Sequence, residues 1–226
     1  MPKIVGRMRV MISRVIVNQN EKEVRKYLKE KGWKEWMVEE IEAENGQVKI
    51  ADLRKWLKKS FLKRKSGEVS VFLIKGADNL SLQCQNTLLK PLEEPEEGVI
   101  YVLTVKSLSK LLPTIVSRCM KIDLSQGEKK VIDGEKWRRL SQVWQGELAD
   151  CVELIEDLSK EEGVGLLLQE VMEKLETGLR KWPSKTRVKM AQVTLDCYRG
   201  WQLKVNKKLV LGKLILGGWA LINLDN

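Results

Sequence analysis

The residues that could do chemistry in this chain of 226 are arginine, lysine, the carboxylates and cysteine, because the sequence contains no histidine. Catalysis by a Ser-His-Asp or Cys-His arrangement is therefore excluded, and so are metal sites that need histidine ligands. The four cysteines are each more than 30 residues apart in the sequence: Cys84, Cys119, Cys151 and Cys197. With no CxxC pair, we expect no zinc site, no resident metal and no disulfide scaffold. Reduced cysteines and a cytoplasmic location are the default.

Binding of anions is a second chemistry that the composition favours. Lys and Arg number 41 against 31 Asp and Glu, so the formal net charge is +10, which favours acidic partners and nucleic acid first. The densest basic segment follows Trp56 and holds four candidates for contacts with DNA phosphates: Lys58, Lys59, Lys63 and Arg64. The alternative is a solvated helix end. Trp33 and Trp36 could form a base-stacking pair, although core packing is the commoner use of such residues.

Strand and helix patterns alternate through the first 124 residues. Apolar runs predict strands at 15–17, 69–74, 99–105 and 120–124, and a weaker one at 37–42. Asn20 is a candidate cap for a helix after the first strand, and another helix is expected from about Asp52. A further helix carries Cys84, Leu88 and Leu92 on one face. Strands that alternate with helices predict a parallel α/β domain over residues 1–124.

The pattern changes after residue 124. Residues 125–146 begin with a polar stretch and are expected to form a linker or a reduced lid with room for one helix. Residues 147–226 are expected to be all-helical, with helices at 147–158, 164–180, 186–204 and 207–221. The longest apolar run, 209–222, has 14 residues with a lysine inside, whereas a bilayer span needs about 20. No membrane association is expected.

Several short motifs follow one another in a fixed order between residues 69 and 119. They are Ala77-Asp78-Asn79-Leu80, Gln85-Asn86-Thr87-Leu88-Leu89-Lys90, Leu92-Glu93-Glu94-Pro95, Leu111-Leu112-Pro113-Thr114-Ile115 and Ser117-Arg118-Cys119. This series resembles the AAA+ domain of bacterial clamp-loader subunits. The whole chain resembles a shortened, delta-prime-like member of the DNA polymerase III clamp-loader family. The resemblance implies a degenerate AAA+ (RecA-like) parallel-sheet domain followed by a helical oligomerisation (collar) domain at 147–226.

An ATPase of this family needs a phosphate loop and an acidic residue that holds Mg²⁺. The first expected strand is followed by Asn18-Gln19-Asn20-Glu21-Lys22, and no GxxxxGK[ST] segment occurs in the chain. The position of the metal-binding acid, after the strand at 69–74, holds Lys75 and Gly76. Asp78, two residues further on, is interpreted as a turn or cap residue. We therefore predict that the chain does not bind nucleotide or metal and does not hydrolyse ATP.

The Ser-Arg-Cys motif implies a role in a neighbouring subunit. By the resemblance, Arg118 is an arginine finger that reaches the ATP site of that neighbour, and Ser117 and Cys119 position it. Without the flanking motifs, Arg118 would be interpreted as a solvated or salt-bridged residue. Gln85 and Asn86 are candidates for an interface near the edge of the sheet, with ordinary surface amides of a helix as the alternative. Pro91 departs from the family pattern and is expected to kink or shorten its helix.

The resemblance also implies the partners. We expect gamma/tau-type ATPase subunits, a clamp-opening delta subunit, the sliding clamp and primed DNA, with ATP and Mg²⁺ only in the neighbouring subunits. Three alternatives stay open: an ATPase with a non-standard phosphate loop, a structural subunit without a working finger, and a stand-alone basic DNA-binding protein on a decayed AAA+ scaffold.

Overall fold

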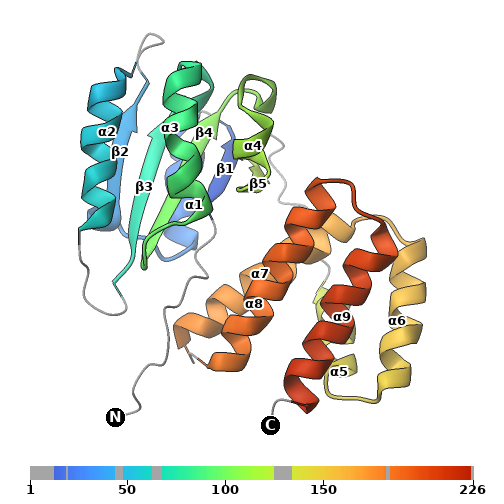
Figure 1. Ribbon diagram of the computed structural model, residues 1–226. Helices are drawn as coiled ribbons and strands as arrows, with labels where there is room; N and C mark the ends of the chain where they lie inside the picture. Colours follow the sequence, from blue (N-terminus) through green and yellow to red (C-terminus); the bar gives the residue numbers. More distant parts are fainter. Residues whose placement is uncertain are drawn as a thin grey trace. The chain divides into compact units, whose positions relative to one another are not determined.

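The chain is described by a computed structural model that covers residues 13–18, 20–43, 48–62, 68–124, 134–181 and 184–224. It divides into two compact units, with the boundary between residues 129 and 130. The first unit is an α/β structure and the second is helical (Figure 1). The two are described separately.

The first unit is built on a five-stranded parallel sheet with the strand order β2-β3-β4-β1-β5. The strands are β1 (Arg14–Val17), β2 (Val38–Glu42), β3 (Ser70–Lys75), β4 (Val99–Val105) and β5 (Met120–Asp123). Arg14, at the start of β1, is aligned with Val102 of β4 and with Met120 of β5. Because all strands run in one direction, their carboxyl ends lie at one edge of the sheet and their amino ends at the other. All five strands were predicted from the sequence.

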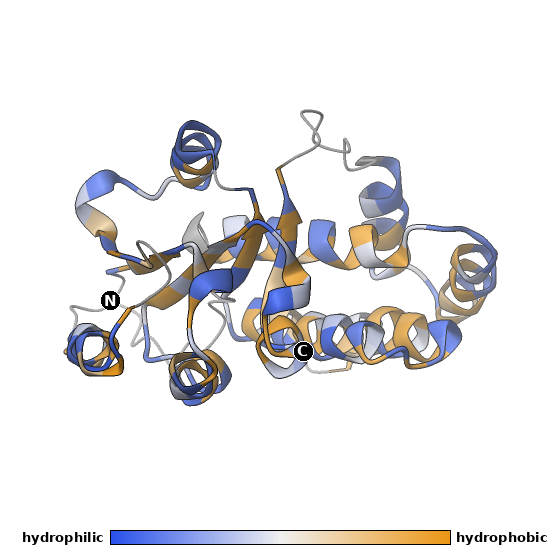
Figure 2. Cartoon of the chain, turned by 90° about the horizontal axis from the view of Figure 1, so that it is seen from above, coloured by the Kyte–Doolittle hydropathy of each residue, from blue (hydrophilic) through white to orange (hydrophobic). Residues whose placement is uncertain are grey.

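Helices cover both faces of this sheet. The helix α1 (Glu21–Glu30) packs on one face, where Val24, Tyr27 and Leu28 join Ile16 in one apolar cluster. The opposite face carries α2 (Ile50–Lys58), α3 (Leu82–Glu93) and α4 (Pro113–Val116), whose apolar residues share a second cluster with Val15. Successive residues of β1 therefore point to opposite faces, as the pleat of a strand requires. Figure 2 shows the apolar residues gathered in the strands and the polar residues on the outer sides of the helices.

Short 3₁₀ turns within the described residues connect these elements: η1 (Glu35–Met37), η3 (Lys59–Phe61), η4 (Ala77–Asn79) and η5 (Leu108–Lys110). The helix α3 does not end at Pro91, because it continues to Glu93 and the Glu94 amide still donates to the carbonyl of Lys90. The expectation of an early end at Pro91 is therefore wrong. The proline is buried within the last turn of the helix.

The second unit contains α5 (Gly134–Val143), α6 (Leu148–Lys160), α7 (Val164–Lys181), α8 (Lys185–Gln202) and α9 (Lys207–Asn223). The segment 125–146, expected as a linker or reduced lid, thus contains α5, which belongs to this unit. The indole of Trp144 donates to the carbonyl of Ile215 at 3.1 Å, and the indole of Trp219 donates to the carbonyl of Gly146 at 2.9 Å. These bonds tie the end of α5 to α9. None of the described helices has the length and apolar character needed to cross a membrane.

Candidate functional site

The turn from β1 into α1 lies at the carboxyl edge of the sheet, where open α/β sheets bind ligands. Its own side chains accept hydrogen bonds from backbone amides at and just before the start of α1. The Asn18 side-chain oxygen accepts from the Asn20 amide at 2.7 Å, and that of Asn20 accepts from the Lys22 amide at 3.0 Å. The Asn18 side-chain amide donates to the carbonyl of Leu124 at 3.0 Å, just after β5. Asn20 is the predicted helix cap, and the structure confirms it.

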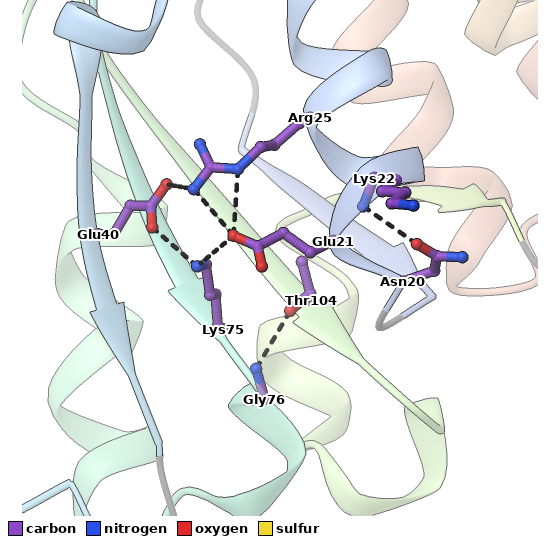
Figure 3. A network of polar contacts seen from close by, with 8 residues as sticks. All are labelled: Asn20, Glu21, Lys22, Arg25, Glu40, Lys75, Gly76 and Thr104. Carbon is purple, nitrogen blue, oxygen red and sulfur yellow. Dashed lines mark hydrogen bonds and ion pairs between the residues drawn. The ribbon is translucent and has the colours of Figure 1, made fainter.

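Beside this turn, two cations and two carboxylates form a closed network of ion pairs (Figure 3). The Lys75 ammonium lies 3.0 Å from a carboxylate oxygen of Glu21 and 2.9 Å from one of Glu40. A terminal nitrogen of the Arg25 guanidinium lies 2.8 Å from Glu21 and 3.3 Å from Glu40. Three elements, α1, β2 and β3, are thereby joined by a set of charges that sums to zero.

The network borders a cavity of about 180 Å³, lined in part by Glu21, Lys75, Gly76, Asn79 and Thr104. Gly76 adopts a left-handed conformation (φ 65°), and its amide donates to the Thr104 hydroxyl at 3.1 Å. That amide is therefore not available to a ligand. Both carboxylates of the network are paired with cations, so neither offers an uncompensated charge to Mg²⁺. Among the described residues, no cluster of three or more carboxylates or cysteines could hold a metal ion.

The ion pairs shift the pKa values of Glu21 and Lys75. Hydrogen bonds from Lys75 and then Arg25 lower the pKa of Glu21. Burial acts to lower the pKa of Lys75, but its hydrogen bonds with Glu40 and Glu21 outweigh this, and the pKa is raised. A lowered carboxyl pKa adds stability that is present above the unfolded-state value and is lost as the pH falls through the folded-state value. The network therefore stabilises the α/β unit at neutral pH and weakens in acid.

We expect Lys75→Met to lower the free energy of unfolding by about 1 kcal/mol at pH 7, because it leaves Glu21 and Glu40 with only one cation. The loss should shrink below about pH 4.3, the ordinary glutamate value, as the Glu21 carboxylate takes up a proton. Urea unfolding at pH 7 and at a pH below about 4.3 measures this loss. Lys59→Met is the matched control, since Lys59 pairs with Glu39 at 2.8 Å with both side chains about half exposed, and it should cost less than about 0.5 kcal/mol. An equal loss in both variants, or no pH dependence, would contradict the assignment.

Arg118 lies at the opposite edge of the sheet. It follows α4 and comes two residues before Met120, which begins β5 and is aligned with the first residue of β1. One terminal nitrogen of its guanidinium donates to the carbonyl of Thr114 at 2.9 Å, and the other donates to the Glu93 carboxylate at 3.1 Å. The Ser117 hydroxyl donates to the same Thr114 carbonyl, and Cys119 is buried. The side chain of Arg118 is about one quarter exposed, so it is held and still reachable.

Gln85 and Asn86 have different places, although they are neighbours in the sequence. Gln85 is buried, so the alternative of an ordinary surface amide is wrong for this residue. Its side-chain nitrogen donates to the carbonyls of Leu80 and Lys110, and its side-chain oxygen accepts from the Leu112 amide at 2.8 Å. This side chain holds the loop before α4 through hydrogen bonds within the α/β unit. Asn86 is exposed and remains a candidate for an interface contact.

The residues proposed for DNA contacts are only partly described. Lys58 and Lys59 are exposed at the end of α2, while Lys63 and Arg64 lie outside the described residues. Trp36 is 73% exposed, but Trp33 is only 2% exposed. The Cζ atom of Arg14 lies 4.7 Å from the centroid of the Trp33 ring. Trp33 and Trp36 therefore do not form a stacking pair, and that interpretation is wrong.

The partners of Lys75 and Arg118 could not be recognised from the sequence. Lys75 stands out there as a lysine where a metal ligand is expected, without the carboxylates that pair with it. Glu93, the partner of Arg118, appears there only as part of the motif Leu92-Glu93-Glu94-Pro95. Asp78, interpreted as a turn or cap residue, is buried in η4 and accepts from the Lys106 amide at 3.3 Å.

The parallel sheet with the order β2-β3-β4-β1-β5, covered on both faces and followed by a helical unit, defines a protein of the AAA+ class. A family model described as DNA polymerase III, delta subunit matches residues 12–128, just over half of the chain. The chain belongs to this family, which is a clamp-loader family of AAA+ proteins.

Named relatives agree with this assignment. DNA polymerase III subunit tau/gamma of Haemophilus influenzae is 39% identical over 85 residues, which are 38% of this chain and 12% of the relative. Subunit delta' of Bacillus subtilis is 35% identical over 63 residues (28% and 19%), and subunit tau of Escherichia coli is 36% identical over 99 residues (44% and 14%). The chain thus spans less than a quarter of the length of these relatives.

A solved structure of a DNA polymerase III, gamma subunit-related protein from Thermotoga maritima aligns with 92% of this chain and 94% of its own. The TM-score is 0.45 and the sequence identity is 18%.

Proposed function

We propose that this chain is a non-hydrolysing, delta-prime-like subunit of a clamp loader and that it supplies Arg118 as an arginine finger to the ATP site of a neighbouring subunit. The complex would use ATP to place the sliding clamp on primed DNA. The observation that supports the proposal most strongly is that the ion-pair network and Arg118 lie at opposite edges of one sheet.

This separation limits what Arg118 can reach. Glu21 follows the carboxyl end of β1 and Lys75 is the last residue of β3, whereas Arg118 lies before the amino end of β5. A strand of four residues alone spans on the order of 10 Å. Arg118 therefore cannot serve a ligand at the carboxyl edge of its own sheet. If it acts on a phosphate, that phosphate is bound elsewhere, and the proposal places it in the neighbouring subunit.

The chemistry of such a contact follows from the side chain. A guanidinium is always charged and offers two donors in a plane, which matches the oxygens of a phosphoryl group. Placed against the γ-phosphate, it offsets the charge that develops in the transition state. ATP and Mg²⁺ would be held by gamma/tau-type neighbours, and this chain would need no cofactor of its own. The helical unit would join the oligomer, together with a clamp-opening delta subunit.

The first test of the proposal is nucleotide binding by the isolated chain. We expect no binding of Mg²⁺-ATP at millimolar nucleotide in calorimetry, because the expected phosphate and metal positions hold Lys75 and its carboxylate partners. The cognate ATPase subunit serves as the positive control. Saturable binding with one nucleotide per chain would contradict a non-hydrolysing role and favour the unusual ATPase.

DNA contact is a separate part of the proposal. Lys58 and Lys59 are the described candidates for phosphate contacts, and they would act within the assembled loader. Salt-sensitive DNA affinity of the isolated chain, without any partner, would instead favour the stand-alone DNA-binding protein. That protein would not depend on Arg118.

A further inference from the structure

The helix α3 contacts both ends of the segment that carries Arg118. Near its start, Gln85 binds the carbonyl of Lys110 and the amide of Leu112, and Leu112 is the N-terminal cap residue of α4. Its last residue is Glu93, whose carboxylate accepts from the Arg118 guanidinium at 3.1 Å. The segment from 110 to 118 is thus fixed to one helix at two places.

The two contacts with Arg118 differ in kind. The Thr114 carbonyl belongs to α4 itself and moves with the arginine, whereas Glu93 belongs to a different helix. Among the described residues, the Glu93 contact is thus the hydrogen bond that ties the guanidinium to a different helix of the α/β unit. The Glu93 side chain is more than half exposed and that of Arg118 about one quarter, so the pair lies at the surface and still leaves part of the guanidinium reachable.

We propose that Glu93 is a positioning residue for Arg118: its carboxylate holds the guanidinium in the orientation in which it meets a phosphate of the neighbouring subunit. The inference rests on the proposed function and adds to it a residue of α3. Glu93 touches no reacting atom, so its effect is conveyed only through Arg118.

The physical reason is conformational entropy. A free arginine side chain samples many rotamers, and most of this freedom must be lost when it docks on a phosphate. An acceptor that already restrains the side chain reduces that loss at the moment of reaction. Because the finger acts on charge that develops in the transition state, the benefit should appear in kcat and leave the KM for ATP unchanged.

The experiment measures clamp- and primer-stimulated ATP hydrolysis by a loader reconstituted from the full chain and its cognate ATPase subunits. We expect Glu93→Ala to lower kcat roughly 10-fold with an unchanged KM. Glu93→Gln keeps an oxygen acceptor and should stay within about threefold of wild type. Glu94→Ala is the matched control, because it removes the same charge. Glu94 is exposed and forms no ion pair among the described residues.

Arg118→Ala in the same assay separates the two proposals. If Arg118→Ala turns over like wild type in an assembled loader, the finger itself is refuted, whatever Glu93 does. If Arg118→Ala is impaired while Glu93→Ala matches wild type, the positioning role of Glu93 is overturned and the finger stands. A rise in turnover for Glu93→Ala would also overturn it, because Glu93 would then restrain the finger. Equal losses in Glu93→Ala and Glu94→Ala would show a general charge effect and refute it too.

Discussion

Replacing Arg118 with alanine should lower the clamp- and primer-stimulated turnover at the ATP site that it serves by about 10³-fold. The side chain is held at the amino edge of the sheet by Thr114 and Glu93, and alanine removes the only group there that the proposal assigns to a phosphate. Arg118→Lys keeps a positive charge but loses the planar pair of donors, so it should recover little of the rate. The measurement is ATP hydrolysis by the reconstituted loader with and without clamp and primed DNA.

Assembly has to be shown for each variant, because a subunit that fails to join the complex would also lower turnover. Size-exclusion chromatography of the mixture with the ATPase subunits supplies that check. Arg54→Ala is the control variant, since Arg54 is an exposed arginine of α2 with no assigned role. Normal turnover by an assembled Arg118→Ala loader would reduce this chain to a structural subunit. Failure of the wild-type chain to join the loader would end the clamp-loader proposal altogether.

The elements of the fold could be predicted because their signals are local. The run Val99–Val105 is apolar apart from Thr104, and it forms the strand β4, every residue of which is buried. Asn20 has the type and spacing of a helix cap and is one. In such places a few neighbouring residues decide the outcome, so the sequence alone was sufficient.

The partners within the sites could not be predicted, because the parallel strand order brings them together from distant parts of the chain. Glu21 and Lys75 are 54 residues apart, and they meet only because β1 and β3 end at the same edge of the sheet. Gln85 has the sequence context of a surface amide, and its burial depends on a loop 25 residues further on. Trp33 follows α1 in the sequence, and its ring lies against Arg14 of β1, the strand that precedes α1. None of these contacts leaves a periodic pattern in the sequence.

Two glycines of α9 differ in how closely other residues approach them. Gly218 is buried, and a methyl group there would collide with Nε1 and Cε2 of Trp144 and lie 2.8 Å from its Cζ2. Trp144 is itself buried, donates to the carbonyl of Ile215 and packs edge to face on Trp137, so it cannot move aside at low cost. Overpacking typically costs 1–3 kcal/mol, and the strained hydrogen bond adds roughly 1. The better helix propensity of alanine returns about 1 kcal/mol.

Gly218→Ala should therefore lower the free energy of unfolding of the helical unit by about 2 kcal/mol, measured by urea unfolding of the full chain followed by helical circular dichroism. Gly212→Ala is the matched control in the same helix, because no atom lies within 4 Å of the added methyl group. It should raise the same free energy by up to about 1 kcal/mol, through helix propensity and a less flexible unfolded chain. The same chemical change thus has opposite signs six residues apart, since only Gly218 is needed for the close approach of α9 to Trp144. Destabilisation by both variants, or by neither, would show that this contact does not set the packing of α9.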